Sequence, residues 1–347
     1  MIAPADLEAC RAAIRTGSHS FHAASKLLPP SVRDPALALY AFCRLADDAV
    51  DLRRDKAAAV LRLRDRLELV YAGRPLDSPA DRAFAAVVED FAMPRALPEA
   101  LLEGLAWDAM GRRCADLSAL LDYSARVAAA VGVMMCVLMK VRDRHTLARA
   151  ADLGLAMQLT NIARDVGEDA REGRLYLPLD WLADAGIDPE AFLAAPSATP
   201  ALRSVVARLL KEAERLYLRA DPGVQGLPLA CRPGIFAAGR IYRGIGLKVA
   251  AAGFDSVTRR ARTTKGEKLL WLAGAAARTA ATAIMPRPAT IFAAPAAETA
   301  YLVSAAARRP AAPGFWGDGR AGALIEVLAQ LEARDRARRG EDGPRAV

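Results

Sequence analysis

A helical period in almost every long segment limits this chain to an all-α fold. Stretches rich in Ala, Leu and Arg are bounded by Pro, Gly or Asp, and alternating Val, Ile and Thr runs are almost absent. We therefore predict an all-α protein without a sheet. The expected helices cover residues 34–54, 55–72, 78–91, 98–112, 120–140, 145–166, 201–219, 228–252 and 265–282.

The breaks between these helices are too short to separate domains. They fall at 73–75, 173–178 and 196–200, whereas Pro and Gly recur from 286 to 319 before a short amphipathic helix at 320–339. We therefore predict one helical domain over 1–285 and a C-terminal extension with a short helix and a polar tail over 286–347.

Charge and cysteine usage restrict the partners and the compartment. Lys and Arg outnumber Asp and Glu by 48 to 40, which favours anionic partners, although a biased genome composition is an alternative reason for the excess of Arg. The basic segment 259–268 lacks the interleaved aromatic residues of a nucleic-acid site, so we predict phosphate or lipid headgroups rather than nucleic acid. Five scattered cysteines without a C-x-x-C pair, and a start without a secretory signal, favour the cytoplasm.

The longest uncharged apolar stretch is too short to cross a membrane. It covers residues 127–139, whereas a spanning helix needs roughly 20 residues. We therefore predict a buried helix here, and expect any membrane contact to be peripheral.

Two short acidic patterns, far apart in the chain, carry the clearest chemical signal. YAFCRLADDAVD and QLTNIARDVGED each contain D-x-x-x-D and each follow or include an apolar run. At helical spacing, the polar residues of each pattern lie three or four positions apart and project from one side of a helix. They are Tyr40, Arg44, Asp47 and Asp51 in the first pattern, and Gln158, Asn161, Asp165 and Asp169 in the second.

Carboxylates four residues apart repel one another, so this repeated arrangement needs a physical reason. Hard divalent cations supply one, because Mg²⁺ binds one or two carboxylates together with water and substrate phosphates. The alternative is that the acids decorate solvated faces and pair with the abundant arginines. Two copies favour a metal site between facing helices. Asp165→Asn is then expected to lower turnover by orders of magnitude and to leave thermal stability nearly unchanged or higher.

These residues identify a family resemblance. YAFCRLADDAVD and QLTNIARDVGEDAREGRLYLP closely resemble the two aspartate-rich signatures of the squalene and phytoene synthase family. SFHAASKLLP, YSARVAAAVGVMM and RRARTTKGEKL extend the likeness over about 17–268, and it is greatest to the bacterial members that form phytoene. The resemblance implies a single-domain isoprenoid synthase bundle with a deep central cavity. It also implies dependence on Mg²⁺, with Mn²⁺ as an alternative, and no use of NADPH.

The resemblance also implies roles for individual residues. The metal ligands would be Asp47, Asp51, Asp165 and Asp169. Tyr123 would lie in the cavity near the reacting carbons, although an ordinary aromatic at the start of a helix is the alternative. The residues that bind the diphosphates would be Ser18, Ser20, Tyr40, Arg44, Gln158, Asn161, Arg164, Arg174, Tyr176, Tyr242 and Arg260, with Arg262 as a competing choice for the last.

The reaction implied is the head-to-head joining of two C20 prenyl diphosphates, through prephytoene diphosphate, to phytoene. The alternatives are a synthase that uses C15 donors to make squalene, dehydrosqualene or hydroxysqualene, and a non-catalytic assembly factor with the same fold. Other enzymes of carotenoid biosynthesis are candidate partners. Relatives carry Tyr and Gly where this chain has Ala125 and Ala129. We expect the small residues here to border the tunnel for a C20 tail: Ala125, Ala128, Ala129, Ala130 and Gly132, with Gly154 and Ala156 before the second pattern.

Overall fold

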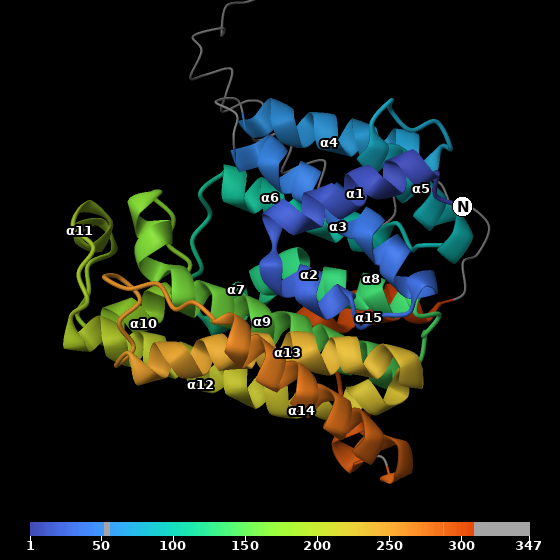
Figure 1. Ribbon diagram of the computed structural model, residues 1–347. Coiled ribbons are helices and arrows are strands. Elements are labelled where there is room, and N and C mark those ends of the chain that lie inside the picture. The colour runs from blue at the N-terminus through green and yellow to red at the C-terminus, as the bar shows by residue number, and fades with distance from the viewer. Residues whose placement is uncertain (52–55, 287, 309–347) are drawn as a thin grey trace, which may run out of the picture.

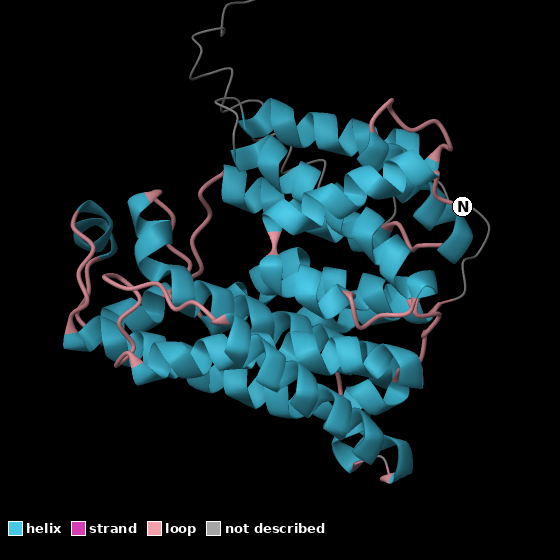
Figure 2. Ribbon diagram, viewed as in Figure 1, coloured by secondary structure: helices cyan, strands magenta, loops and turns pink. Residues whose placement is uncertain are grey.

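A computed structural model describes residues 1–51, 56–286 and 288–308, and this part of the chain is helical, without a strand (Figure 2). It confirms the all-α prediction, because each helix expected between residues 34 and 282 is present. These helices are α3 (Pro30–Asp51), α4 (Lys56–Tyr71), α5 (Pro79–Phe91), α6 (Ala96–Ala109), α7 (Leu117–Ser124) with the π-turn η1 (Ala125–Ala129) and α8 (Ala130–Leu138), α9 (Arg144–Arg171), α12 (Pro200–Ala220), α13 (Arg232–Ala251) and α14 (Lys265–Ile284).

The described chain also contains helices that the periodicity did not predict. They are α1 (Pro4–Gly17), α2 (His19–Ser25), α10 (Leu179–Asp184), α11 (Pro189–Ala194) and α15 (Ala300–Ala307). All but α1 have eight residues or fewer, too few for a clear apolar period. In addition, α9 continues to Arg171, beyond its predicted end at 166. The helix predicted over 320–339 lies outside the described residues.

Two groups of helices enclose the centre of the molecule. In the view of Figure 1, α1, α3, α4 and α5 lie above α2 and α8, and α9, α12, α13 and α14 lie below them. The long helix α9 packs along α12, α13 and α8, and α13 packs in turn against α14. Because α9 touches most of the other elements, its side chains reach both the buried centre and the outer helices.

Close packing between the middle helices depends on two glycines. A Cβ atom on Gly154 of α9 would lie 2.6 Å from Cα of Ala129 in the π-turn, and one on Gly132 of α8 would lie 2.8 Å from the carbonyl oxygen of Ala150. Neither helix could approach so closely with a larger residue at these positions. The glycines therefore bring α8 and α9 together along the wall of the central cavity.

The segment after α14 returns to the core. Arg149 of α9 donates to the Thr290 carbonyl at 2.8 Å, and Arg219 of α12 donates to the Ala294 carbonyl at 2.9 Å. Beyond them, α15 packs against α6, α8 and α9, and its Leu302 is fully buried. The hydrophobic core therefore continues past residue 285, into the segment predicted to be an extension.

Among the described residues, one continuous helical stretch, Leu117–Leu138, has the length and hydropathy of a membrane span. Within this stretch, 67% of the most apolar 18-residue segment is buried inside the protein. A core helix of a folded domain has the same properties. This burial agrees with the prediction of a buried helix over 127–139.

Candidate active site

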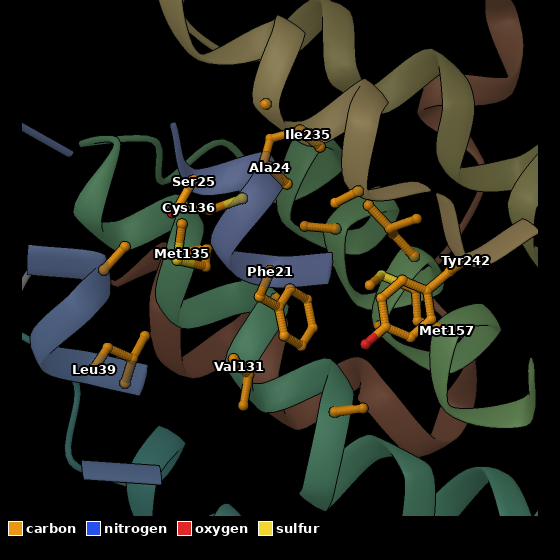
Figure 3. A pocket seen from close by; sticks show the side chains of 18 of the residues that line it. Phe21, Ala24, Ser25, Leu39, Val131, Met135, Cys136, Met157, Ile235 and Tyr242 are labelled. Atoms are coloured by element: carbon orange, nitrogen blue, oxygen red, sulfur yellow. The ribbon is translucent and has the colours of Figure 1, made fainter. Parts of the chain in front are cut away.

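An elongated, largely apolar cavity of about 340 Å³ lies at the centre of the bundle. Its walls come from α2, α3, α8, α9 and α13, as Figure 3 shows for Phe21, Leu39, Val131, Met157 and Ile235. Helix α9 alone lines it from Thr146 to Asn161, which at 1.5 Å per residue is about 22 Å. The shape suits a long, flexible apolar chain.

Polar side chains lie at the end of the cavity nearest the second acidic pattern. Four residues predicted to bind diphosphate line the cavity: Tyr40, Gln158, Asn161 and Tyr242. The ring of Phe21 lies 5.4 Å from that of Tyr242 and 6.5 Å from that of Tyr40 (Figure 3). Burial raises the pKa of Tyr242 to about 12, although the nearby Arg164 guanidinium opposes this rise, so the hydroxyl remains a hydrogen-bond donor at neutral pH.

The junction between α1 and α2 shapes this end of the cavity. Gly17 ends α1, and a Cβ atom there would lie 2.2 Å from the hydroxyl of Tyr40. Ser18 caps α2, because its hydroxyl accepts a hydrogen bond from the backbone N–H of Phe21 at 3.3 Å. In this structure Ser18 therefore orients the helix that carries Phe21. The side chain of Ser20 lies outside the described part of the structure.

Asp165 of the second pattern is bound by two guanidinium groups. Arg164 Nε and Arg260 Nε each donate to its Oδ1 at 2.8 Å. Burial alone would raise the pKa of Asp165, but the hydrogen bonds and charges of the two arginines outweigh it and hold this pKa below its usual value. Asp165 is therefore a stable, ionised carboxylate even without a metal.

Asp169, one turn further along α9, has the opposite shift in pKa. Burial, and then the negative charge of Asp165, raise its pKa to about 7, and the positive charge of Arg174 only lessens this rise. No ion pair to Asp169 is present among the described residues. This carboxylate would gain most from a bound cation.

Gly167 lets a distant loop reach the acidic pattern. Its backbone N–H donates to the carbonyl of Ser256 at 2.9 Å, and a Cβ atom at this position would lie 2.6 Å from Cα of Val257. This contact brings Arg260 to Asp165, while the carbonyl of Arg262 accepts from Lys248. Of the two competing arginines, the structure places Arg260 at the second pattern.

Tyr123 and Tyr176 form a cluster with a residue that the sequence did not single out. Their hydroxyls donate to the two carboxylate oxygens of Asp108, at 2.9 and 2.8 Å, and their rings stack with centroids 5.1 Å apart. Neither tyrosine is among the residues that line the 340 Å³ cavity, although Tyr123 was expected there. Arg174 pairs with Glu172. The available signal for Asp108 was an acid near the end of helix α6, which is mostly apolar but also carries Glu99 and Glu103.

The first acidic pattern is described only in part. Arg44 is exposed on α3, and the backbone of α3 continues through Asp47 to Asp51, where the helix ends. The side chains of Asp47 and Asp51 lie outside the described part of the structure. The convergence of the two aspartate pairs therefore stays a prediction.

The described side chains fit one half of a magnesium site. Asp165 and Asp169 offer carboxylate oxygens, and Oδ1 of Asn161 is buried without a hydrogen-bond partner in the described chain. Hard oxygen donors with room for water and phosphate suit Mg²⁺. No group of three His, Cys, Asp or Glu side chains able to hold a metal occurs among the described residues. A complete site would thus require the first pattern as well.

The small residues of the middle helix divide between the cavity and the core. Ala128 and Gly132 line the cavity together with Gly154 of α9, as predicted for this face. The remaining small residues that we expected at the tunnel are buried but do not line it: Ala125, Ala129, Ala130 and Ala156. The expectation for Ala156 is wrong, because its fully buried side chain is turned about 100° around α9 from the lining residue Met157 and packs in the core.

Comparison with known proteins decides the family. The sequence model of the squalene/phytoene synthase family matches residues 14–267. The chain belongs to this family. It is 64% identical to the phytoene synthase of Cereibacter sphaeroides, with 97% of this chain and 96% of the relative covered, and 62% identical to that of Rhodobacter capsulatus, with 97% and 98% covered.

Solved structures of the squalene/phytoene synthase family share the fold. A dehydrosqualene synthase in complex with a ligand superposes with a TM-score of 0.73 at 29% identity, covering 80% of this chain and 97% of its own. A squalene synthase from Alicyclobacillus acidocaldarius gives a TM-score of 0.67 at 24% identity, covering 72% and 95%. The all-helical isoprenoid synthase architecture expected from the sequence is thus confirmed.

Proposed function

We propose that this protein is a prenyltransferase that joins two geranylgeranyl diphosphate molecules head to head, through prephytoene diphosphate, to phytoene. Enzymes of this family use prenyl diphosphates and generally depend on a metal ion. The near full-length identity to two phytoene synthases supports the product. The observation that carries the proposal is the elongated apolar cavity whose polar end, at Gln158 and Asn161, lies on α9 one turn before Asp165 and two turns before Asp169.

The chemistry requires charge stabilisation at one end of the cavity and exclusion of water along the rest. Loss of diphosphate from an allylic carbon leaves a carbocation beside a multiply charged leaving group. Arg164 and Arg260 supply positive charge at the polar end, and the hydroxyls of Tyr40 and Tyr242 can donate to phosphate oxygens. Apolar side chains such as Val131 and Met135 keep water from the cation.

Each product molecule requires the loss of two diphosphates and two protons. In the first half, one donor loses diphosphate, the double bond of the second attacks the resulting cation, and proton loss closes a cyclopropane. In the second half, loss of the remaining diphosphate allows the ring to rearrange, and a final proton loss gives phytoene. No reductant is needed, which agrees with the expectation that NADPH is not used.

We assign the metal site to Asp165 and Asp169 of the second pattern together with Asp47 and Asp51 of the first. When bound there, Mg²⁺ would neutralise charge on the diphosphate and so make it a better leaving group. The raised pKa of Asp169 and the unpartnered Oδ1 of Asn161 support this assignment.

Incubation of the purified protein with a single substrate tests the reaction. With Mg²⁺ and geranylgeranyl diphosphate, and without NADPH, we expect phytoene as the hydrocarbon identified by mass spectrometry. A matched reaction with EDTA should give none. Turnover of the C15 donor alone, to a C30 hydrocarbon, would assign the protein to the C15-using synthases instead.

A substitution in the cavity tests the chain length. Ala128→Phe places an aromatic ring in the wall of the cavity, so the preference in a competition between C20 and C15 donors should shift towards C15. Ala12→Phe adds the same ring to the exposed surface of α1 and should not change the preference. If Ala128→Phe retained the C20 preference of the parent, the cavity would not hold the tail.

We also propose that the protein is cytoplasmic and binds membranes peripherally. A net charge of +8 and a substrate with long apolar tails support the proposal. High salt should release most of the protein from anionic vesicles. Retention that only detergent reverses would contradict a peripheral contact.

A further inference from the structure

A second cavity lies on the outside of the helix wall that encloses the first. It has a volume of about 270 Å³ and lies between α12, α13 and α14. Leu153, Ala220, Val224 and Ile235 line both cavities, which therefore lie back to back. None of the residues assigned to the reaction lines this second cavity, so its chemistry is separate.

Positive charge exceeds negative charge in the second cavity. Arg240 and Arg243 of α13 and Arg278 of α14 line it, against one acid, Asp221. Arg278 Nη2 pairs with Asp221 at 3.0 Å, and Arg243 pairs with Glu214 outside the lining. Arg240 has no acidic partner within ion-pair distance in the described chain, and the charge of Asp221 acts on all three arginines, so the lining keeps a net positive charge.

Two glycines make room for the cationic and aromatic side chains. A Cβ atom on Gly274 of α14 would lie 2.7 Å from Nη1 of Arg240, and one on Gly244 of α13 would lie 2.3 Å from Cη2 of Trp271. The backbone therefore accommodates a guanidinium and an indole side by side at this position. Such a combination suits a ligand that carries both a phosphate and an apolar group.

The rim of the second cavity is apolar and exposed. Leu247 lines it and is 66% exposed. Leu270, which precedes the lining residue Trp271 on α14 but does not itself line the cavity, is 70% exposed. After Glu267, no acidic residue follows in the sequence of α14. An anion with an apolar tail would meet attraction at the arginines and no repulsion from this helix.

We propose that the second cavity binds the phosphate group of an amphiphile, with Arg240 as its principal cation and Leu247 and Leu270 beside its apolar tail. Two sources share this chemistry: an anionic phospholipid in a membrane, and a soluble prenyl diphosphate. The site does not depend on the reaction proposed above, and it can be tested without turnover.

Trp271 supplies the signal for a binding test on the full-length protein in EDTA. One arm titrates vesicles of phosphatidylcholine with and without phosphatidylglycerol, and the other titrates geranyl diphosphate. We expect a change in tryptophan fluorescence that Trp271→Phe removes. Arg240→Gln should weaken the binding roughly fivefold, the effect of one arginine at an anionic surface, and Arg240→Lys should restore most of it.

Arg11→Gln on α1 is the matched control, because it removes the same charge far from the second cavity and should bind like the parent. Thermal melting checks that each variant is folded. Phytoene formation in detergent is measured separately, so that a failure of the proposed reaction is not mistaken for a failure of the second cavity to bind its ligand. Arg240-dependent binding to anionic vesicles would identify a phospholipid, and Arg240-dependent binding of geranyl diphosphate alone would identify a soluble prenyl diphosphate. If neither ligand lost affinity in Arg240→Gln, or if Arg11→Gln lost as much, the proposal would be overturned.

Discussion

Helix α9 carries acidic residues in two regions, and their surroundings differ. In its first half, Asp152 is fully buried, and one carboxylate oxygen meets both Arg149 Nε at 2.9 Å and Arg219 Nε at 3.2 Å. In its second half, Asp165 accepts hydrogen bonds from Arg164 and Arg260, whereas Asp169 has no ion pair among the described residues. Burial of an acid is common to the two regions, whereas an uncompensated charge occurs only in the second.

The difference separates a structural carboxylate from one suited to a ligand. At Asp152, the two arginines pair with one carboxylate, so they join α9 to α12 and leave no negative charge free to bind a cation. Burial raises the pKa of both Asp152 and Asp169, but only Asp169 lacks an ion pair among the described residues. A buried carboxylate in that state, on the helix that lines a substrate-sized cavity, is the pattern of a functional site. Substitutions in the two regions should therefore affect different properties, stability at Asp152 and turnover at Asp169.

The largest effect is expected at Asp169. Asp169→Asn removes a proposed metal ligand, so kcat for phytoene formation should fall roughly 10³-fold. The melting temperature without metal should stay equal or rise, because the repulsion from Asp165 is relieved. Asp184→Asn, at an exposed position of α10, is the control and should change neither quantity. Loss of stability with retained activity would make Asp169 a structural residue.

Asp152→Asn should show the reverse pattern. It leaves the buried Arg149 without its counter-charge, which costs about 3 kcal/mol of unfolding free energy, measured by urea denaturation. The kcat of the folded fraction at low temperature should remain near that of the parent. A double variant, Arg149→Met with Asp152→Leu, removes both charges and should recover much of the loss. An equal loss in the double variant would show that packing, rather than charge, is responsible.

A pH dependence follows from Asp169. Its pKa is about 7 in the folded protein and about 4 when unfolded, so the folded state binds the extra proton between these values. Without metal, stability should therefore fall as the pH rises from about 4 to 7, by up to about 4 kcal/mol relative to Asp169→Asn. Mg²⁺ at pH 8 should stabilise the parent more than the variant. Parallel stability curves for the two proteins would rule out the shifted pKa.

The smallest of the expected effects on stability concerns Asp165. The sequence predicts that Asp165→Asn leaves stability unchanged or higher, but the structure shows two arginines bound to this carboxylate. We now expect a loss of about 1–2 kcal/mol in unfolding free energy, together with the loss of turnover already predicted. A gain in stability would show that Arg164 and Arg260 do not hold this carboxylate in solution.

The sequence predicted those features that depend on neighbours along one helix. The long helices and the stripe of Gln158, Asn161, Asp165 and Asp169 follow from spacing alone. It did not predict the bridge from Asp108 to Tyr123 and Tyr176, because that contact joins three elements whose meeting depends on the whole fold. The same holds for the pairing of Asp152 with Arg219, and for the difference in pKa between two aspartates that look equivalent in the sequence.

The return of the segment after α14 has a consequence for biosynthesis. Because α15 fills the space between α6, α8 and α9, a nascent chain cannot complete its core until these late residues have left the ribosome. Until then, Arg149 and Arg219 lack the carbonyl groups of Thr290 and Ala294, and the apolar faces that α15 covers stay exposed to solvent. The last steps of folding therefore wait for the synthesis of α15, and in that interval the chain depends most on protection against aggregation.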